Sequence, residues 1–401
     1  PDARHRQLYL PDTNILLTRF LSRQGVAEIS DFMAVAEDDS MPQALVRRVK
    51  CVRGCVSFQL VCDPRFDYGR ASHEVVQRAG EVLFVAETEE RLMLRLRVDA
   101  PVVVRNGAVA VEFTLSAGET AAFVLSSADS SDDWRCSSPD FVTESFKTTQ
   151  DFWHAWVGRC KYRGRWQEIV RRSALVLKLL TSRDHGSIVA AATFGLPEEV
   201  GGARNWDYRF TWIRDASFTV YALMRLGYHR EAHDFMHWIE ARCGEMDAGS
   251  SLQIMYGIDG RHELPEEVLD HLSGYRDSKP VRVGNAAFGQ RQLDIYGELM
   301  DSVYLYDKYG EQVHHDLWTK LSTLVDWVCK HWREKDEGIW EVRGGQQHFL
   351  YSRLMCWVAI DRGLRLANKR SLPAPIDRWQ RVRSEIYNDI FDNFWDEERQ
   401  A

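Results

Sequence analysis

Several features that would define a protein's class are missing from this sequence. Its 401 residues contain no apolar run of about 18 residues, the length that a membrane-spanning helix needs. The first residues show no basic stretch followed by an apolar one, so no secretion signal is visible. We therefore expect a cytoplasmic protein that does not associate with membranes. Because the first residue is Pro rather than Met, we also expect residues upstream of it.

Excess positive charge and nucleotide-binding motifs are also absent. Lys and Arg number 51 against 59 Asp and Glu, and the formal net charge of −8 argues against a nucleic-acid partner. No GxGxxG follows a strand pattern, and the sequence has no GxxxxGK followed by Ser or Thr, no HExxH and no GxSxG. These absences argue against dinucleotide and nucleoside-triphosphate sites, zinc proteases and α/β-hydrolases.

Cysteine pairs with metal-ligand spacing are missing as well. The eight cysteines are scattered along the chain, with no CxxC pair and no Cys/His spacing typical of a zinc site. We expect free, buried thiols in a reducing compartment. The sequence predicts no metal and no organic cofactor.

What the chain does contain changes in character near residue 145. Before this point, short β-rich apolar segments alternate with turn residues, which is typical of an antiparallel sandwich or barrel. Asn106-Gly107, between two Val-rich segments, is the clearest hairpin turn. Strands are expected at residues 16–20, 56–61, 82–85, 92–98, 102–104, 108–115 and 121–125.

After a segment rich in Ser and Asp (126–145), the apolar pattern changes to a helical period. Consecutive helices joined by long loops fit a bundle, a solenoid or an α/α toroid, and the lack of a fixed repeat disfavours the solenoid. The sequence predicts a β-sandwich domain (1–145), a linker (146–165) and a helical domain (166–401). Helices are expected at residues 149–160, 166–180, 215–226, 230–246, 287–309, 315–333, 349–367 and 375–394.

The densest functional pattern lies in residues 201–215, where four aromatic, three Arg and two Asp side chains precede a helix. Arg and Asp offer fixed donors and acceptors, and aromatic rings offer stacking faces. This combination suits a sugar ring, which has hydroxyls on its edge and C–H groups on its faces. The spacing of Trp206, Tyr208 and Trp212 would place them on one side of an extended segment. An aromatic corner held by Arg–Asp pairs is the structural alternative.

Two further segments carry polar side chains in loops or at helix starts. In the Gly-rich loop around Trp340-Glu341, a carboxyl group desolvated beside Trp would stay protonated and could act as a general acid. A solvated loop Glu is the alternative. In residues 282–294, Asn285, Gln290 and Asp294 could bind a ligand or cap a helix, and Gln290 and Asp294 would share one helix face.

Taken together, these segments resemble glycoside hydrolase family 15, the family of glucoamylases, glucodextranases and some bacterial α,α-trehalases. The resemblance is to the prokaryotic type, and it extends to residues 10–14 (LPDTN) and 64–70 (PRFDYGR), so it covers nearly the whole chain. It implies a multidomain β + α protein. An N-terminal antiparallel β-supersandwich would be followed by an (α/α)6 toroid, with the site at one mouth of the toroid.

The resemblance also implies an exo-acting, inverting hydrolase that releases β-glucose from α-glucosides such as trehalose, isomaltose or malto-oligosaccharides. In this reaction one carboxylic acid protonates the glycosidic oxygen, and a carboxylate activates water on the opposite face. By motif position Glu341 is the general acid, with Trp340 beside it. The other substrate-binding residues implied are Trp212, Arg214, Asp215 and, from weaker matches, Tyr256, Asn285 and Gln290.

The sequence departs from the family pattern at its ends. The family's general base lies near the C-terminus in an Ala-Glu-Glu or Ala-Glu-Gln segment that these residues lack. The expected helices supply only about the first half of an (α/α)6 toroid. We therefore expect a chain incomplete at both ends, with a missing segment or an oligomeric partner completing the ring. If the chain is active as it stands, Glu199 is the first alternative base.

Two other functions fit the same residues. A non-catalytic carbohydrate-binding or sensing protein would keep the glucose pocket without the base. A sugar phosphorylase of the same architecture would replace the base with a phosphate site, because fold alone does not decide the chemistry. All three functions imply a small α-glucoside or oligosaccharide as the partner.

Overall fold

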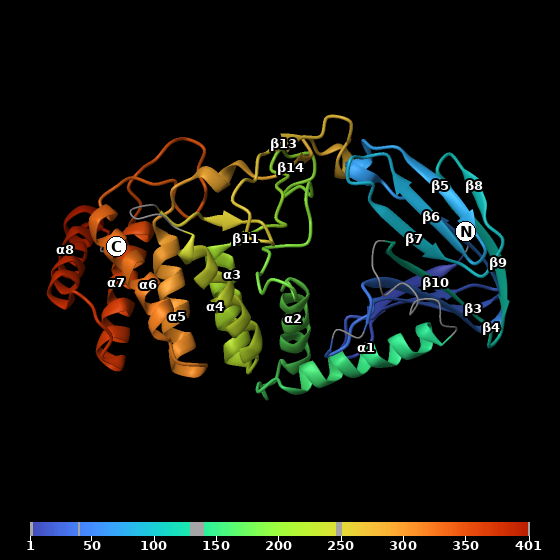
Figure 1. The fold of residues 1–401 in the computed structure, drawn as a ribbon, viewed down its shortest axis with the longest axis horizontal. Coiled ribbons are helices and arrows are strands. Elements are labelled where there is room, and N and C mark those ends of the chain that lie inside the picture. Colours follow the sequence, from blue (N-terminus) through green and yellow to red (C-terminus); the bar gives the residue numbers. More distant parts are fainter. Residues whose placement is uncertain (1–2, 39–40, 129–139, 246–250, 400–401) are drawn as a thin grey trace. The chain divides into compact units, whose positions relative to one another are not determined.

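The computed structural model describes residues 3–38, 41–128, 140–245 and 251–399 (Figure 1). The chain forms two compact units, Pro1–Arg159 and Cys160–Ala401. Cys136 and most of the Ser- and Asp-rich segment at 126–145 lie outside the described residues. Helix α1 (Phe141–Gly158) belongs to the first unit and occupies most of the segment expected to be a linker.

The first unit is built on an antiparallel sheet with the strand order β1-β2-β3-β4-β10-β7-β6-β5, and β9 joins it through β4 and carries β8. Strand β4 is 19 residues long. Its first part pairs with β3 and β10, and its last part pairs with β9. The strands are β1 (Arg4–Tyr9), β2 (Leu16–Leu21), β3 (Gly25–Met33), β4 (Ala44–Cys62), β5 (His73–Arg78), β6 (Glu81–Ala86), β7 (Met93–Arg97), β8 (Val103–Arg105), β9 (Ala108–Ser116) and β10 (Thr120–Ser127).

Alternate residues of this sheet face two different apolar clusters, because successive side chains of a strand point to opposite faces. Val49 and Phe123 pack into a core with side chains of β6, β7 and β9. Val46 and Val124 face the other way and pack with Phe141 of α1. The antiparallel, β-rich N-terminal region predicted from the sequence is confirmed.

The hairpin predicted at Asn106-Gly107 joins β8 to β9, with Arg105 paired to Ala108. Both turn residues have positive φ, 52° and 79°, as a type I′ turn requires. Several strands were not predicted, among them β1, β3 and β5. All six residues of β1 are exposed, so this strand carries no alternation of buried and exposed positions that a sequence pattern could reveal.

The second unit consists of helical hairpins arranged in two rows. Helices α3, α5 and α7 contact one another in turn and form one row, while α4, α6 and α8 form the other (Figure 1). The hairpins α3–α4, α5–α6 and α7–α8 link the rows. The helices are α2 (Gln167–Leu179), α3 (Ile213–Leu226), α4 (His229–Gly244), α5 (Asp294–Tyr309), α6 (His315–His331), α7 (Leu350–Arg370) and α8 (Ile376–Phe394).

Close packing of α5 on α7 depends on Gly297. A Cβ atom at this position would lie 2.3 Å from the carbonyl oxygen of Met355, far inside van der Waals contact. Between α6 and α8, the buried rings of Trp318 and Trp379 meet edge to face with centroids 6.1 Å apart. These contacts hold the helices in fixed positions, so the ends of the helices are fixed as well.

Two expectations about helix starts are wrong. The helix expected over residues 287–309 begins at Asp294, because Gln290 is extended and the preceding residues 286–289 form a short 3-10 turn. Gln290 and Asp294 therefore do not share a helix face. The helix expected over residues 215–226 begins two residues earlier, at Ile213, so Asp215 lies in its first turn.

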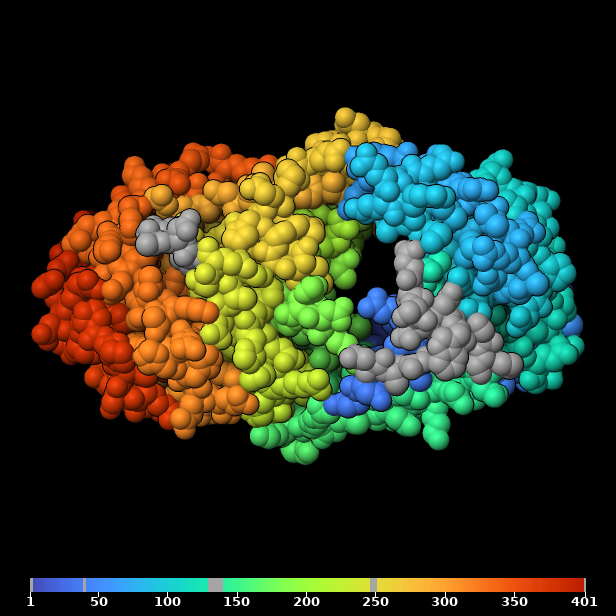
Figure 2. All heavy atoms as spheres, viewed as in Figure 1, coloured from blue at the N-terminus to red at the C-terminus, as the bar shows by residue number. Residues whose placement is uncertain are grey.

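The connections that precede α3, α5 and α7 are much longer than those that follow them. They gather at one end of the helices, and the space-filling view shows the segments before α5 and α7, in yellow and orange, covering that end (Figure 2). Within the described residues, no helix is both long and apolar enough to cross a membrane.

Candidate active site

A cavity of about 1000 Å³ lies in the second unit where α3, α5 and α7 begin. Its walls come from the connections that precede these helices and from the first turn of α3. The volume is at the upper end of the range of roughly 300–1000 Å³ typical of small-molecule sites. Of the predicted site residues, the cavity is lined by Trp212, Arg214, Asp215, Asn285, Trp340 and Glu341.

The loop between α6 and α7 presents Glu341 to the cavity. A bridge between Asp336 and Gln347 closes the base of this loop. Glu341 itself has a φ of 52°, a left-handed conformation that is uncommon for a residue other than glycine. Gly338 has a φ of 67° and lies so close to Phe349 that a Cβ atom would be 2.7 Å from the ring. The close contact of Gly338 with Phe349 therefore restricts the conformation of the loop, and the backbone of Glu341 is strained.

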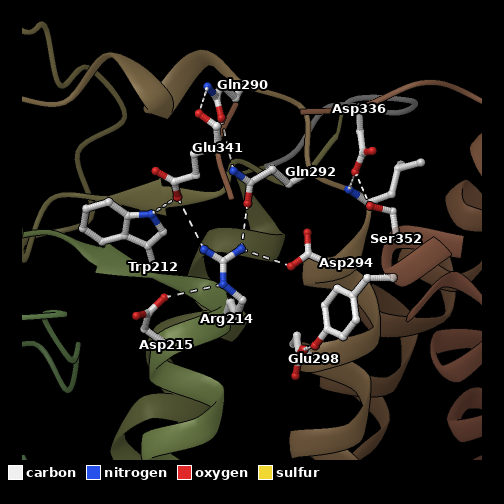
Figure 3. A network of polar contacts seen from close by, with 12 residues as sticks. Trp212, Arg214, Asp215, Gln290, Gln292, Asp294, Glu298, Asp336, Glu341 and Ser352 are labelled. Carbon is white, nitrogen blue, oxygen red and sulfur yellow. Dashed lines mark hydrogen bonds and ion pairs between the residues drawn. The ribbon is translucent and has the colours of Figure 1, made fainter. Parts of the chain in front are cut away.

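The carboxyl group of Glu341 is held through one of its two oxygens (Figure 3). The indole Nε1 of Trp212 donates a hydrogen bond to Oε1 over 2.7 Å, and Nη2 of Arg214 donates to the same atom over 3.4 Å. Oε2 has no hydrogen bond to any residue that the structure describes. The side chain is 25% exposed, so the free oxygen is accessible from the cavity side of the loop.

Arg214 connects Glu341 to the interior of the unit. Its Nη1 donates to Oε1 of Gln292 over 2.8 Å and to Oδ2 of Asp294 over 3.0 Å, and its Nε lies 3.8 Å from Asp215 (Figure 3). Burial opposes the charge of this guanidinium, but the neighbouring carboxylates, Asp294 foremost, raise the pKa of Arg214. It is a fixed cation in contact with three carboxyl groups.

Asp215 adds a second carboxyl group to the cavity wall. Its side chain is 45% exposed. Desolvation by the surrounding walls raises the pKa of Asp215, while the positive charge of Arg214 acts in the opposite direction. Such a group can accept a hydrogen bond from a ligand hydroxyl when ionised and donate one when protonated.

Aromatic side chains form another wall of the cavity. Trp206, Tyr208 and Trp212 all line it, and the rings of Tyr208 and Trp212 are 6.1 Å apart. The hydroxyl of Tyr208 donates to Oε1 of Glu198 over 3.4 Å. Trp340 is 85% exposed, so its indole presents a free face near the cavity. The cavity thus combines flat apolar surfaces with charged groups, as a sugar ring requires.

Three residues predicted from weaker matches have structural contacts. Tyr256 is buried against Trp238, and its hydroxyl accepts from the amide of Gln253. It does not line the cavity, but it pairs with Thr211 and so supports the strand that ends at Trp212. Asn285 lines the cavity, although its side chain caps the 3-10 turn through the amide of Ala287.

Gln290 does not line the cavity either. Its Nε2 donates to the backbone oxygen of Glu341 over 3.4 Å, and its Oε1 accepts from Gln292 over 3.2 Å. Gln290 therefore contacts the loop that carries Glu341.

No role was predicted for Gln292, and Asp294 was predicted only as a ligand-binding or capping residue. Both are buried behind Arg214, at 2% and 0% exposure. A polar pair flanking Leu293 at the start of an apolar helix is the only sequence signal that could have indicated their burial. Glu199 was the alternative base, but its neighbour Glu198 lines the cavity and Glu199 does not.

The described residues contain no group of three or more His, Cys, Asp or Glu side chains placed to hold a metal ion. The seven described cysteines are free, and Cys55 is exposed, contrary to the expectation of buried thiols.

A family model described as "Glycosyl hydrolases family 15" matches residues 164–401 of the chain. The trehalase of Mycobacterium tuberculosis is 36% identical over an alignment 420 residues long. The alignment covers 98% of this chain and 60% of that protein. The trehalase of Thermoplasma acidophilum is 32% identical over 397 residues, which cover 97% of this chain and 66% of that protein. The chain thus spans about 60% of the length of the first curated relatives that it matches.

Among solved structures, the glucoamylase from Saccharomycopsis fibuligera aligns with 55% of this chain and 46% of its own, with a TM-score of 0.39 and 12% identity.

Proposed function

This chain belongs to glycosyl hydrolase family 15, and from that premise we propose that it hydrolyses α-glucosides, with trehalose as the first substrate to test. Relatives named trehalase, at 36% identity over nearly the whole chain, support this choice of substrate. The structural observation that carries the proposal is the Glu341 carboxyl group. It lines an aromatic cavity, with one oxygen held by two N–H donors and the other without a partner among the described residues.

In the proposed reaction, Glu341 is the general acid. Because Oε1 accepts from Trp212 and Arg214, the proton resides on Oε2 and passes from there to the glycosidic oxygen. The bond from the anomeric carbon to that oxygen then breaks, and the departing sugar keeps the proton as a new hydroxyl. The two donors stabilise the carboxylate left on Glu341.

The same cavity would hold the sugar whose anomeric carbon reacts. Trp340 and Tyr208 offer faces on which the C–H surfaces of a sugar ring can pack. Asp215, in the first turn of α3, and the N–H groups of Arg214 can bind its hydroxyls. The guanidinium of Arg214 would bind both the sugar hydroxyls and the carboxyl group of Glu341. Binding of the sugar ring would therefore also align Glu341 with the glycosidic oxygen.

Inversion requires a second carboxylate that removes a proton from water on the opposite face of the ring, roughly 6.5–9.5 Å from the acid. We propose that this base comes from the C-terminal segment of the family pattern. If the 401 residues act alone, Glu198 and Asp215 are the candidates, because they are the other acidic side chains that line the cavity. Glu198 replaces Glu199 as the first carboxylate to test.

The two rows of helical hairpins also fit part of an (α/α)6 toroid. In such a ring α3, α5 and α7 would be inner helices and α4, α6 and α8 outer ones. The cavity would then lie at the mouth of the ring, where the inner helices begin. This is the arrangement that the family resemblance implies, and it forms part of the proposal.

Proton NMR of the products, with trehalose, isomaltose and maltose as substrates, tests the proposal. Early release of β-glucose supports inverting hydrolysis and identifies the substrate. Release of α-glucose first, or formation of a sugar phosphate only when inorganic phosphate is added, contradicts it. Glucose binding without turnover of any substrate, even with a longer natural chain, favours the carbohydrate-binding alternative.

A further inference from the structure

Arg214 has more negative partners than its single charge can neutralise. Asp294, Asp215 and Glu341 all lie within ion-pair distance of its guanidinium, at 3.0, 3.8 and 3.4 Å. If all three carboxyl groups were ionised, this group of four residues would carry a net charge of −2. Like charges that share a poorly solvated site disfavour one another's ionised form. The group is therefore built to retain a proton on one of its carboxyl groups.

Asp294 is the carboxyl group that lies closest to Arg214. It is fully buried, and its Oδ2 receives the 3.0 Å hydrogen bond from Arg214, while Oδ1 has no hydrogen bond to the described residues. Burial raises the pKa of Asp294, but Arg214 and the amides at the start of α5 act against this shift. The N-terminus of a helix favours a negative charge at this position.

We propose that Asp294 is a positioning residue for the general acid: it fixes Arg214 and offsets its positive charge, so that Glu341 can hold a proton. This inference rests on the proposed function for its catalytic meaning. Without Asp294, no carboxylate on the buried side of Arg214 would offset the positive charge of the guanidinium. Arg214 would then favour the ionised form of Glu341, which has lost its proton from Oε2. Asp294 would thus act on the reaction through Arg214, without contacting the substrate.

The surroundings of both carboxyl groups fit this assignment. Among the described residues around Asp294, the other titratable groups are Glu298 on α5, Asp336 before α7, and Tyr351 and Cys356 on α7, and none of them is a cation. Around Glu341, apart from Arg214, the charge of Glu341 acts on Tyr208, and the other described charged groups that line the same cavity are Glu198, Arg204, Asp215 and Arg343. Among the described cations, Arg214 is the one that contacts both Asp294 and Glu341, whereas Arg204 and Arg343 pair with Glu198 and Glu266.

The indole N–H of Trp212 offers a readout that needs no substrate. Since it donates to Oε1 of Glu341, its ¹H–¹⁵N resonance will change when Glu341 loses its proton. The resonance is assigned by its loss in Trp212→Phe, and its titration should vanish in Glu341→Gln. In Asp294→Asn we expect the midpoint of this titration to move to lower pH by about one unit.

Moving the charge provides the second variant. Gln292→Glu places a carboxylate on the other acceptor of Arg214 Nη1, so the midpoint should move to higher pH. In the double variant Asp294→Asn/Gln292→Glu it should return toward that of the parent. A loss of packing alone would not produce opposite shifts that cancel. If Asp294→Asn does not fold, the sign of the shift in Gln292→Glu decides the matter.

Asp307→Asn is the matched control. Asp307 is equally buried and lies at the opposite end of α5, thirteen residues from Asp294 and so about 20 Å away along the helix. It pairs with its own cations, Lys369 and Arg370. This variant should lose stability without moving the Trp212 titration.

A midpoint in folded Asp294→Asn that is unchanged or raised overturns the inference, whether or not the chain hydrolyses a glucoside. An inactive parent chain, by contrast, counts against the proposed function and leaves the titration result standing. In an active enzyme, the alkaline limb of the pH–rate profile of Asp294→Asn should also move to lower pH.

Discussion

The indole of Trp212 donates to Oε1 of Glu341 across 2.7 Å, although the two residues are 129 positions apart in the chain. Trp212 ends the short strand β11 (Thr211–Trp212) just before α3, and Glu341 lies in the loop before α7. These two helices do not follow one another along the row, because α5 lies between them. The hydrogen bond therefore joins two segments of the cavity wall that are distant in the chain. Because it occupies Oε1 of Glu341, Oε2 is the oxygen that remains available.

Replacing Glu341 with Gln should lower kcat by about 10²–10⁴-fold, because the variant keeps the shape of the side chain but has no proton to transfer. KM should change little. Hydrolysis of trehalose followed by glucose release measures both constants. The exposed Glu90→Gln in the first unit serves as the control. A Glu341→Gln enzyme within about threefold of the parent would remove Glu341 from the role of general acid.

Trp340→Ala should raise KM about tenfold and leave the melting temperature unchanged. The indole is 85% exposed, so its removal costs the folded state little, while a sugar ring would lose a stacking surface. Trp166→Ala provides the comparison, because Trp166 is 57% exposed and does not line the cavity. Equal effects of the two variants on KM would argue against a binding role for Trp340.

Gly338→Ala should lower the activity. It should also lower the free energy of unfolding by about 1–3 kcal/mol. Its φ is 67°, and the new methyl group would meet the ring of Phe349, so the loop that carries Glu341 must shift. Gly344 lies in the same loop with open space around it and no positive φ. The melting temperature of Gly344→Ala should therefore stay close to that of the parent, and a matching loss of stability in both variants would contradict the argument.

Asp307→Asn should destabilise the helical unit at neutral pH but not in acid. Burial alone would raise the pKa of Asp307, but hydrogen bonds from Lys369 and Arg370 lower it. A lowered native pKa stabilises the fold above the unfolded value of about 3.9, and this stabilisation disappears as pH falls through the native pKa.

We expect a loss of about 1–3 kcal/mol at pH 7, and parent and variant should converge as the pH falls through the lowered native pKa of Asp307. Melting curves at a series of pH values measure this difference. Asp316→Asn, on a side chain that is 85% exposed, should show no such dependence. A pH-independent loss in Asp307→Asn would point to packing and not to charge.

Local patterns predicted much of the fold and of the cavity wall. The helical period located α6 and α8 to within two residues at each end, and the Asn106-Gly107 hairpin followed from its turn chemistry. The cavity wall was partly predictable because aromatic and charged residues cluster within residues 201–215.

The parts that the sequence could not predict depend on contacts between distant segments. Asp294 lies 80 positions from Arg214, and nothing near either residue indicates that they form an ion pair. Tyr256 shows the opposite case. It matched a motif, but its partners in the core, such as Trp238, determine that its hydroxyl is buried and bonded to backbone. Only the packing of the helices decides which of these polar groups reach the cavity.

The cavity is lined by the connections that precede one row of helices and by the first turn of α3, while the bodies of the helices pack on one another. The residues that would bind a ligand and the residues that hold the fold together therefore lie in different segments of the chain. Substitutions, insertions and deletions in the connections can reshape what the cavity accepts without disturbing contacts such as that of Gly297 with Met355. A directed-evolution library aimed at a new ligand can therefore be confined to residues 190–208 and 339–349, with the helices left unchanged.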